Sequence, residues 1–284
     1  MKRLWILIFG VALSYGQAVV IRTSTLLDGK GHVLKNTDLV IEGGSITGMR
    51  DAKGKAAIDL TGMTVMPGWI DTHIHATWYF NADGRLEQGG RGAKSTPQQA
   101  ALAAAANLYA TLMGGFTTVQ SLGAELDADL RAQIASGAIA GPRLLTSLRQ
   151  LTESTGDAAR IRAFVRDAKG DGADVVKLFA TASIRDGGKM TMTPEQIAAA
   201  CGEATAQGLR SVVHAHSSDG ARASVMAGCT AIEHGTFLDD ATLELMAKRG
   251  VYFDPNFLVL HNYLENAAVS LPDRQGHWRL RFHR

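Results

Sequence analysis

The pattern of hydrophobic and polar positions changes near residue 65. Before it, residues 19–64 alternate in short apolar and polar segments that glycines interrupt, which is typical of strands joined by turns. From there to about residue 265, short apolar runs alternate with alanine-rich stretches of helical period. Strands and helices that alternate at this spacing indicate βαβ units and a parallel sheet.

The second part predicts seven parallel strands with helices between them. The strands are expected near residues 65–72, 116–121, 143–148, 173–180, 210–215, 229–234 and 251–255. Thr96 and Thr193 are predicted to cap helices, because Pro97 and Pro194 follow them at first-turn positions.

Two α/β architectures compete for this pattern. A closed (β/α)₈ barrel needs eight strands and about 250 residues. An open doubly wound sheet needs a glycine-rich phosphate turn after its first strand, and the sequence has none. We therefore expect an α/β fold with an incomplete (β/α)₈ TIM-like barrel at 65–265, preceded by a small N-terminal β-sandwich unit at 19–64.

The two ends of the chain differ from the rest. Residues 1–18 are predicted to be a signal peptide, because a positive start precedes an apolar run of about ten residues and then small residues. The run is too short for a membrane-spanning helix, so we expect a secreted or periplasmic protein without a membrane span after cleavage. A buried first strand or helix is the alternative. Residues 266–284 are expected to be an atypical basic tail, either a disordered terminus or a sign of truncation, with the eighth strand missing.

Composition narrows the possible partners. Of 284 residues, 46% are hydrophobic and 20% charged, and the net charge of +2 gives no reason to expect nucleic acid or a membrane surface as partner. Export would permit one disulfide between Cys201 and Cys229. Their apolar, alanine-rich surroundings favour two separate buried thiols instead.

Histidines stand at the predicted strand ends. His73 and His75 end the first strand of the second part, and residues two apart in a strand point the same way. Both imidazoles are therefore expected at the barrel mouth, where such barrels place their sites. Three more histidines end the fifth and sixth strands: His214, His216 and His234.

Lys177 lies inside the apolar run DVVKLFAT, at the end of the fourth strand. A buried ammonium is costly unless it is neutralised, paired or chemically used. A side chain that snorkels from a strand edge is the simpler alternative. Because four strand ends present His, Lys, His and His at one face, we expect a shared metal site.

The segment VMPGWIDTHIH resembles the PG-apolar-apolar-D-x-H-x-H signature of the amidohydrolase superfamily. Residues 19–265 resemble the branch with imidazolonepropionase-like enzymes and metal-dependent prolidases (Xaa-Pro and related dipeptidases), on GGFTTVQSLG, DGADVVKLFAT, VVHAH and AIEHGT.

The resemblance implies a centre of two divalent metal ions, with zinc as the expected metal. It implies that His73 and His75 bind one ion, that His214 and His234 bind the second, and that Lys177, carboxylated by carbon dioxide, bridges both. Lys177, His214 and His234 are therefore also the expected catalytic residues.

Residues around that centre have weaker assignments. Asp71 is expected to support the ligands, since such partners orient ligand histidines. Substrate contacts are expected from His216, Trp78 and Tyr79, with ordinary packing as the alternative. Three arginines on predicted loops either bind a substrate carboxylate or are solvated loop charges: Arg85, Arg91 and Arg185.

The resemblance also implies a reaction. Two divalent ions about 3.5–4 Å apart share a hydroxide that attacks a carbonyl, so we expect hydrolysis of C–N (amide or peptide) bonds in small molecules or dipeptides. The family places a proton-relaying aspartate at the end of the eighth strand, and we find no counterpart in the sequence. Losing it predicts turnover lowered by about 10²- to 10⁴-fold.

Three other functions stay open. The same centre would serve an ester, lactone or phosphotriester hydrolase. A truncated, catalytically inactive metal-binding remnant would fit the missing strand. An extracytoplasmic binding module would fit the signal peptide but gives no reason for the aligned His and Lys residues. The sequence does not predict the oligomeric state.

Overall fold

The computed structural model describes residues 18–81, 86–88, 95–259 and 261, in two compact units that divide between Gly68 and Trp69. The predicted boundary at residue 64 is therefore four residues early. Residue 65 ends the last strand of the first unit, so the prediction that a barrel strand begins there is wrong. The predicted basic tail, and all but one residue of the predicted signal peptide, lie outside the described residues.

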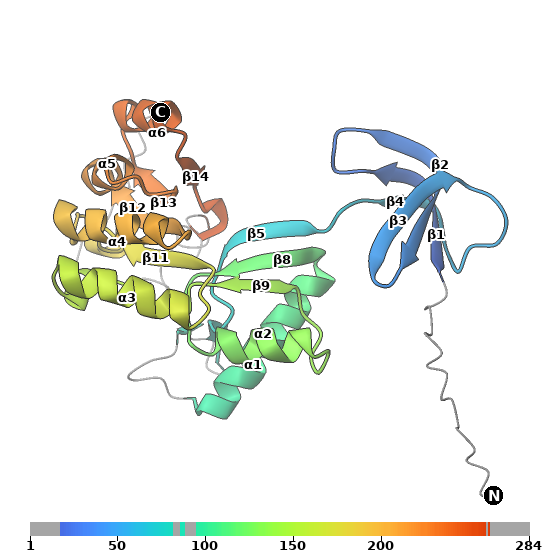
Figure 1. Cartoon of the computed structure of the whole chain (residues 1–284), viewed down its shortest axis with the longest axis horizontal. Helices are drawn as coiled ribbons and strands as arrows, with labels where there is room; N and C mark the ends of the chain where they lie inside the picture. Colours follow the sequence, from blue (N-terminus) through green and yellow to red (C-terminus); the bar gives the residue numbers. More distant parts are fainter. Residues whose placement is uncertain (1–17, 82–85, 89–94, 260, 262–284) are drawn as a thin grey trace, which may run out of the picture. The chain divides into compact units, whose positions relative to one another are not determined.

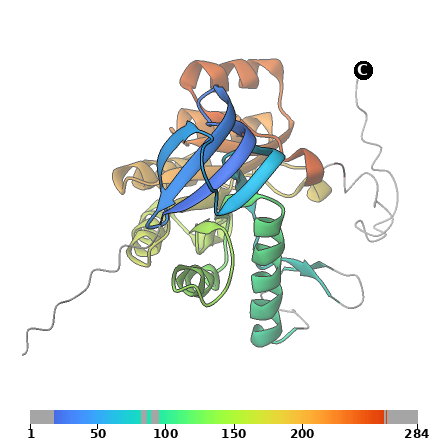
Figure 2. The ribbon, with the colours of Figure 1, turned by 90° about the vertical axis from the view of Figure 1, so that its right-hand side faces the viewer.

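The first unit is one four-stranded sheet, in the order β3-β2-β1-β4. Its strands are β1 (Val19–Leu27), β2 (Val33–Glu42), β3 (Ser45–Asp51) and β4 (Ile58–Val65). Figure 2 shows these strands, in blue, side by side. Arg22 on β1 pairs with the buried carboxylate of Asp38 on β2, with its Nε 2.9 Å from Oδ1. The described residues of the first unit form a single sheet, and a sandwich needs two, so the predicted β-sandwich stays a prediction.

The second unit contains the seven predicted parallel strands. They are β5 (Trp69–Ile74), β8 (Phe116–Ser121), β9 (Arg143–Thr146), β11 (Val175–Phe179), β12 (Arg210–Ser217), β13 (Ala231–Phe237) and β14 (Tyr252–Asp254). The short β10 (Gln150–Leu151) joins β11, and β6 (Tyr79–Phe80) pairs with β7 (Leu86–Glu87).

These strands form two parallel sheets rather than a closed barrel. The orders are β5-β8-β9 and β10-β11-β12-β13-β14 (Figure 1). A main-chain hydrogen bond from Asp174 to the carbonyl of Thr146 connects the two sheets. Within the described residues, β5 pairs only with β8 and β14 only with β13. The α/β class and the parallel strands are confirmed. Because β14 and β5 are not paired in the described residues, the incomplete barrel stays a prediction.

Six α-helices follow strands in the described part of the second unit. They are α1 (Pro97–Met113), α2 (Asp127–Ala135), α3 (Ala158–Gly170), α4 (Pro194–Ala206), α5 (Ser218–Met226) and α6 (Asp240–Arg249), with 3₁₀ turns at Glu153–Thr155 and Ile184–Asp186. Thr96 and Thr193 cap α1 and α4 as predicted, each in a capping box with a glutamine three residues on. Figure 1 shows α3 to α6 along one side of β11–β14, where the largest apolar core forms. No helix in this part of the chain is long and apolar enough to cross a membrane.

A disulfide joins Cys201 on α4 to Cys229, which precedes β13. The prediction of two separate thiols is therefore wrong, although both residues are buried as expected. Packing of α4 against α5 is the reason. The turn after α5 brings the Cα of Cys229 to 5.1 Å from that of Cys201, which is within the normal range for a disulfide.

Candidate metal centre

The predicted ligand residues meet in one pocket of about 520 Å³. His73 is in β5 and His75 follows it, Lys177 is in β11, His214 in β12 and His234 in β13. All five line the pocket. The other lining residues are Trp78, Gln88, Gln150, Phe179, Ser183, Ile184, Arg185, His216, Thr236, Pro255, Asn256 and Val259. Parallel strands end at the same edge of their sheet, and this is why residues up to 161 positions apart converge here.

The imidazole rings form a continuous cluster. Ring centroids are 5.4 Å apart for His73 and His75, 5.2 Å for His73 and His234, and 4.6 Å for His214 and His234. His216 belongs to the cluster as well, since its ring is 4.7 Å from that of His214 and 5.0 Å from that of His234. Its Nδ1 lies 3.0 Å from Oγ1 of Thr236.

Burial keeps these imidazoles neutral. It lowers the pKa of His73, His75 and His214 to about 2 and that of His216 to about 4, with the nearby Lys177 charge as a further cause. Burial also lowers the pKa of His234. Neutral imidazole is the form that binds metal ions, because its free nitrogen carries a lone pair.

Lys177 is only 1% exposed, and its Nζ has no hydrogen-bond partner. Burial lowers its pKa to about 8, although the charges of Glu233 and Asp254 oppose this shift. The lowered pKa increases the fraction of neutral amine near pH 7. A buried, unpartnered amine costs stability, so a group that occupies the pocket and satisfies it would relieve that cost.

The main chain in the middle of β13 adopts an unusual conformation. His234 has φ of 69° and Gly235 has φ of 55°, both in the left-handed region. A Cβ on Gly235 would lie 2.5 Å from Cε2 of Phe253, so only glycine fits there. Left-handed backbone at a non-glycine residue is uncommon and tends to occur at functional sites.

Glu233 is a site residue that the sequence reasoning missed. Its Oε2 lies 2.5 Å from Nδ1 of His73 and accepts a hydrogen bond from Nδ2 of Asn256 at 3.0 Å. The side chain is 2% exposed, and burial raises its pKa, which Lys177 and Asn256 oppose. The sequence did contain a signal, because Glu233 lies inside the apolar segment AIEHG. A charged side chain in an apolar run is costly unless it is paired or used, which is the argument that singled out Lys177.

Asp71 acts on the main chain rather than on a ring. Its Oδ1 accepts a hydrogen bond from the backbone N–H of His73 at 3.0 Å. Its contribution is therefore to fix the end of β5. Between β5 and β14, Oγ1 of Thr72 donates to Oδ2 of Asp254 at 2.8 Å.

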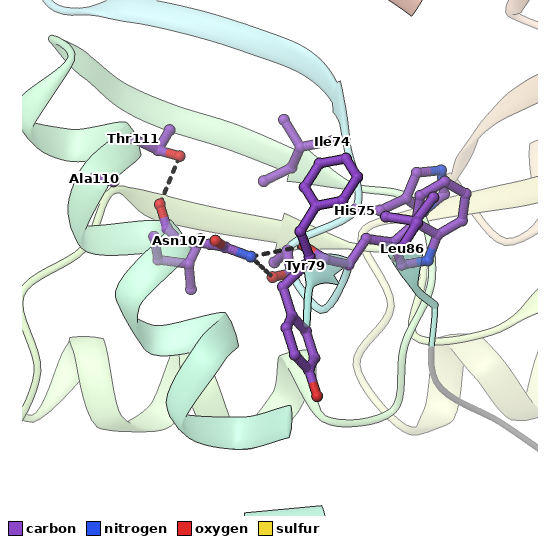
Figure 3. Close-up of a pocket in the computed structure, with 11 residues that line it drawn as sticks. Ile74, His75, Tyr79, Leu86, Asn107, Ala110 and Thr111 are labelled. Atoms are coloured by element: carbon purple, nitrogen blue, oxygen red, sulfur yellow. Dashed lines mark hydrogen bonds between the residues drawn. The ribbon is translucent and has the colours of Figure 1, made fainter. Parts of the chain in front are cut away.

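The predicted substrate-contact residues line two neighbouring pockets. Trp78 lines the histidine pocket and stacks on His75, with ring centroids 3.9 Å apart. Tyr79 lines a mostly apolar pocket of about 390 Å³ (Figure 3), which His75 and Trp78 line as well. Asn107 in that pocket donates to the carbonyls of Ala76 and Trp78, which holds the turn after His75.

Of the three predicted arginines, one reaches the histidine pocket. Arg185 lines it from the 3₁₀ turn Ile184–Asp186. Arg85 and Arg91 lie outside the described residues. Among the described lining residues there is no Asp or Glu, so an anionic ligand would meet a cation and neutral imidazoles there.

The donors fit a metal ion in type and protonation state. Two buried polar atoms in the pocket lack partners, Nδ1 of His75 and Nζ of Lys177. No three His, Cys, Asp or Glu side chains in the described ranges lie close enough together to hold an ion as they stand.

Residues 64–277 match the amidohydrolase family. The chain belongs to this family. The prediction from VMPGWIDTHIH is therefore confirmed, and so is the prolidase-like branch.

Relatives of known structure or function agree with this membership. The chain is 23% identical over 301 aligned residues to ochratoxinase of Aspergillus niger, which covers 90% of this chain and 62% of that protein. It thus spans less than two thirds of that relative's length. It is similar to a Xaa-Pro dipeptidase crystallised with methionine in the active site, at 28% identity and a TM-score of 0.79, over 89% of this chain and 70% of the dipeptidase chain. A putative prolidase from Bifidobacterium longum is 26% identical with a TM-score of 0.66, over 85% of this chain and 61% of that one.

Proposed function

We propose that this chain carries the centre of a metal-dependent hydrolase that cleaves C–N bonds in amides or dipeptides. Family membership supports this class of reaction, and the structurally similar Xaa-Pro dipeptidase supports small peptides as substrates. Lys177 carries the proposal. Its buried amine lies among neutral imidazoles with no hydrogen-bond partner, and the ring of Phe179, with its centroid 5.3 Å away, does not replace one.

Each ligand residue has a proposed place. His73 and His75 would hold one divalent ion, His214 and His234 a second, and carboxylated Lys177 both, with zinc the expected metal. Such ions, when bound, polarise a carbonyl and lower the pKa of a water molecule.

Carboxylation of Lys177 is proposed as the step that completes the donor set. The neutral Nζ attacks carbon dioxide, a nitrogen–carbon bond forms, and one proton leaves to solvent. The product is a carbamate with one negative charge and two oxygen donors. The lowered pKa of Lys177 supports this step, since only the unprotonated amine carries the lone pair.

The pocket favours a substrate with an apolar body and a free carboxylate. Trp78, Phe179 and Ile184 supply apolar contact, while Arg185 supplies a cation at the rim. His216, which lines the pocket from β12, would contact the substrate as well. Because no carboxylate lines the described pocket, protonation of the leaving amine lacks an evident donor, and the proposal includes slow turnover.

Export is proposed as part of the function. The disulfide Cys201–Cys229 supports the secreted or periplasmic location expected from the N-terminal residues, because structural disulfides persist mainly in oxidising compartments.

Metal analysis joined to a substrate panel tests this function. We expect close to two zinc ions per chain after loading with bicarbonate, about one or fewer in Lys177→Met, and slow hydrolysis of at least one dipeptide or N-acyl amino acid. Cleavage of esters or phosphotriesters alone would favour the other hydrolase classes. Metal bound without hydrolysis would favour the inactive remnant, and no bound metal would refute the proposal.

A further inference from the structure

Glu233 and His73 form the shortest contact of the centre. They lie on β13 and β5, 160 residues apart, and no main-chain pairing joins these strands in the described part of the chain. Their side chains are 2% and 6% exposed, so water contributes little to either group. A contact of 2.5 Å between Oε2 and Nδ1 requires a shared proton, because two bare lone pairs would repel each other.

The atom that carries this proton decides whether His73 can bind a metal ion through its other ring nitrogen. If Nδ1 carries it and donates to Glu233, the lone pair of the neutral ring is on Nε2. His73 lines the histidine pocket, and its Nδ1 is engaged by Glu233, so Nε2 is the nitrogen left for a ligand there. The opposite tautomer would present an N–H to the pocket and exclude a metal ion.

Asn256 fixes the orientation of the carboxylate. Its Nδ2 donates to the same Oε2 of Glu233 at 3.0 Å and to the carbonyl of Asp254 at 3.1 Å. Asn256 has φ of 52°, a left-handed conformation that asparagine tolerates better than most residues. A chain of hydrogen bonds thus runs from the end of β14 through Glu233 to the ring of His73.

Glu233 is not simply a counter-ion for Lys177. The charges attract, but Nζ of Lys177 has no hydrogen-bond partner and forms no ion pair in the described ranges, whereas both contacts of Glu233 are hydrogen bonds. The geometry therefore directs the carboxylate to His73.

We propose that Glu233 is a positioning residue that holds His73 as the Nδ1–H tautomer, so that Nε2 faces the pocket as a metal ligand. This rests on the proposed metal centre, although the tautomer itself does not require a bound ion. Carboxylates that accept a hydrogen bond from a ligand histidine typically change metal affinity by 10- to 100-fold when removed.

Nitrogen-15 NMR of histidine-labelled, metal-free protein tests the tautomer directly, with the His73 signals assigned by their loss in His73→Asn. We expect His73 protonated on Nδ1 in the unaltered protein and in Glu233→Gln, whose side-chain oxygen can still accept. In Glu233→Met the acceptor is gone, and we expect the Nε2–H tautomer to increase. His73 protonated on Nε2 in the unaltered protein would overturn the proposal.

Zinc affinity, measured by competition with a chelator, supplies the second readout. We expect a 10- to 100-fold loss in Glu233→Met and a smaller loss in Glu233→Gln. Asn256→Gly keeps the carboxylate of Glu233 and suits the left-handed backbone. It should therefore also lose less zinc affinity than Glu233→Met. Asp127→Asn is the matched control, because Asp127 is an equally buried carboxylate that binds Thr146 away from the pocket.

The two readouts separate the possible failures. Equal affinities in Glu233→Met and the unaltered protein would overturn the positioning role. Losses of thermal stability without a change in tautomer would show a merely structural role and overturn it as well. If the unaltered protein binds no zinc, the proposed function fails, and the positioning of a metal ligand fails with it, whatever tautomer the NMR spectrum shows.

Discussion

Removing the disulfide between Cys201 and Cys229 should destabilise the second unit by several kcal/mol. The bond closes a loop with a sequence separation of 28. In the chain-entropy treatment a loop of this length corresponds to about 3.6 kcal/mol at 25 °C, because the unfolded chain regains the freedom that the bond removed. For a unit of this size, that loss lowers the melting temperature by about 7–14 °C.

Urea unfolding of the double variant Cys201→Ala/Cys229→Ala measures this loss. Both cysteines are buried, so reductant should act only once the chain unfolds. The unaltered protein unfolded in the presence of dithiothreitol should therefore lose the same free energy of unfolding, and the double variant should be indifferent to reductant. Cys229 lies two residues before β13, the strand that carries Glu233 and His234, so zinc affinity should weaken as well.

A loss below about 1 kcal/mol would refute the reasoning, as would two free thiols titrated in the unreduced, denatured protein. A loss that is large in the double variant but unaffected by reductant in the unaltered protein would show that the sulfur atoms stabilise by packing rather than by cross-linking.

Three further outcomes follow from the same structure. Because burial holds the pKa of His214 at about 2 while the unfolded chain titrates near 6.5, the unfolded state binds the extra proton below pH 6.5. Each such imidazole should therefore cost about 1.4 kcal/mol of stability per pH unit as pH falls from 6.5 toward 2. Urea unfolding of metal-free protein at pH 7, 6 and 5 should show a shallower loss in His214→Asn, and equal slopes would contradict the assignment. Arg185→Gln should raise KM about tenfold for substrates with a free carboxylate but not for their amides. Lys189 is a nearby exposed cation outside the pocket lining, so Lys189→Gln should leave KM unchanged for both kinds of substrate. Gly188→Ala should cost at least about 1 kcal/mol more than Gly208→Ala. Both glycines have positive φ, but only at Gly188 would a Cβ clash, lying 2.7 Å from Cβ of His216. Equal unfolding free energies in urea would argue against that clash.

The periodic features of the sequence predicted the fold well. Apolar runs gave the seven parallel strands, and Thr96 and Thr193 gave two helix starts, because strand burial and helix capping are local properties. The boundary near residue 64 was early because the apolar run TVMPGWID continues through a link between two strands. Pairing of Cys201 with Cys229 depends on how α4 packs against α5. No local pattern in the sequence encodes the distance between the two cysteines.

The candidate site was only partly predictable. Strand ends on one sheet edge meet by topology, so the convergence of His73, Lys177 and His214 was accessible from the sequence. Tyr79 follows Trp78 directly, yet Trp78 lines both pockets and Tyr79 lines the apolar one, a difference that adjacent positions in the sequence do not reveal. The contact of Glu233 with His73 joins β13 to β5, which belong to different sheets, and strand register alone does not specify it.

The left-handed main chain at His234 has a practical consequence for redesign. The left-handed φ of His234 sets the direction in which its Cα–Cβ bond leaves the strand. Asparagine and aspartate adopt this conformation more readily than other side chains. Position 234 is therefore a place where an imidazole nitrogen can be exchanged for a side-chain oxygen with little disturbance of the strand, and where the metal preference of the proposed centre can be tested.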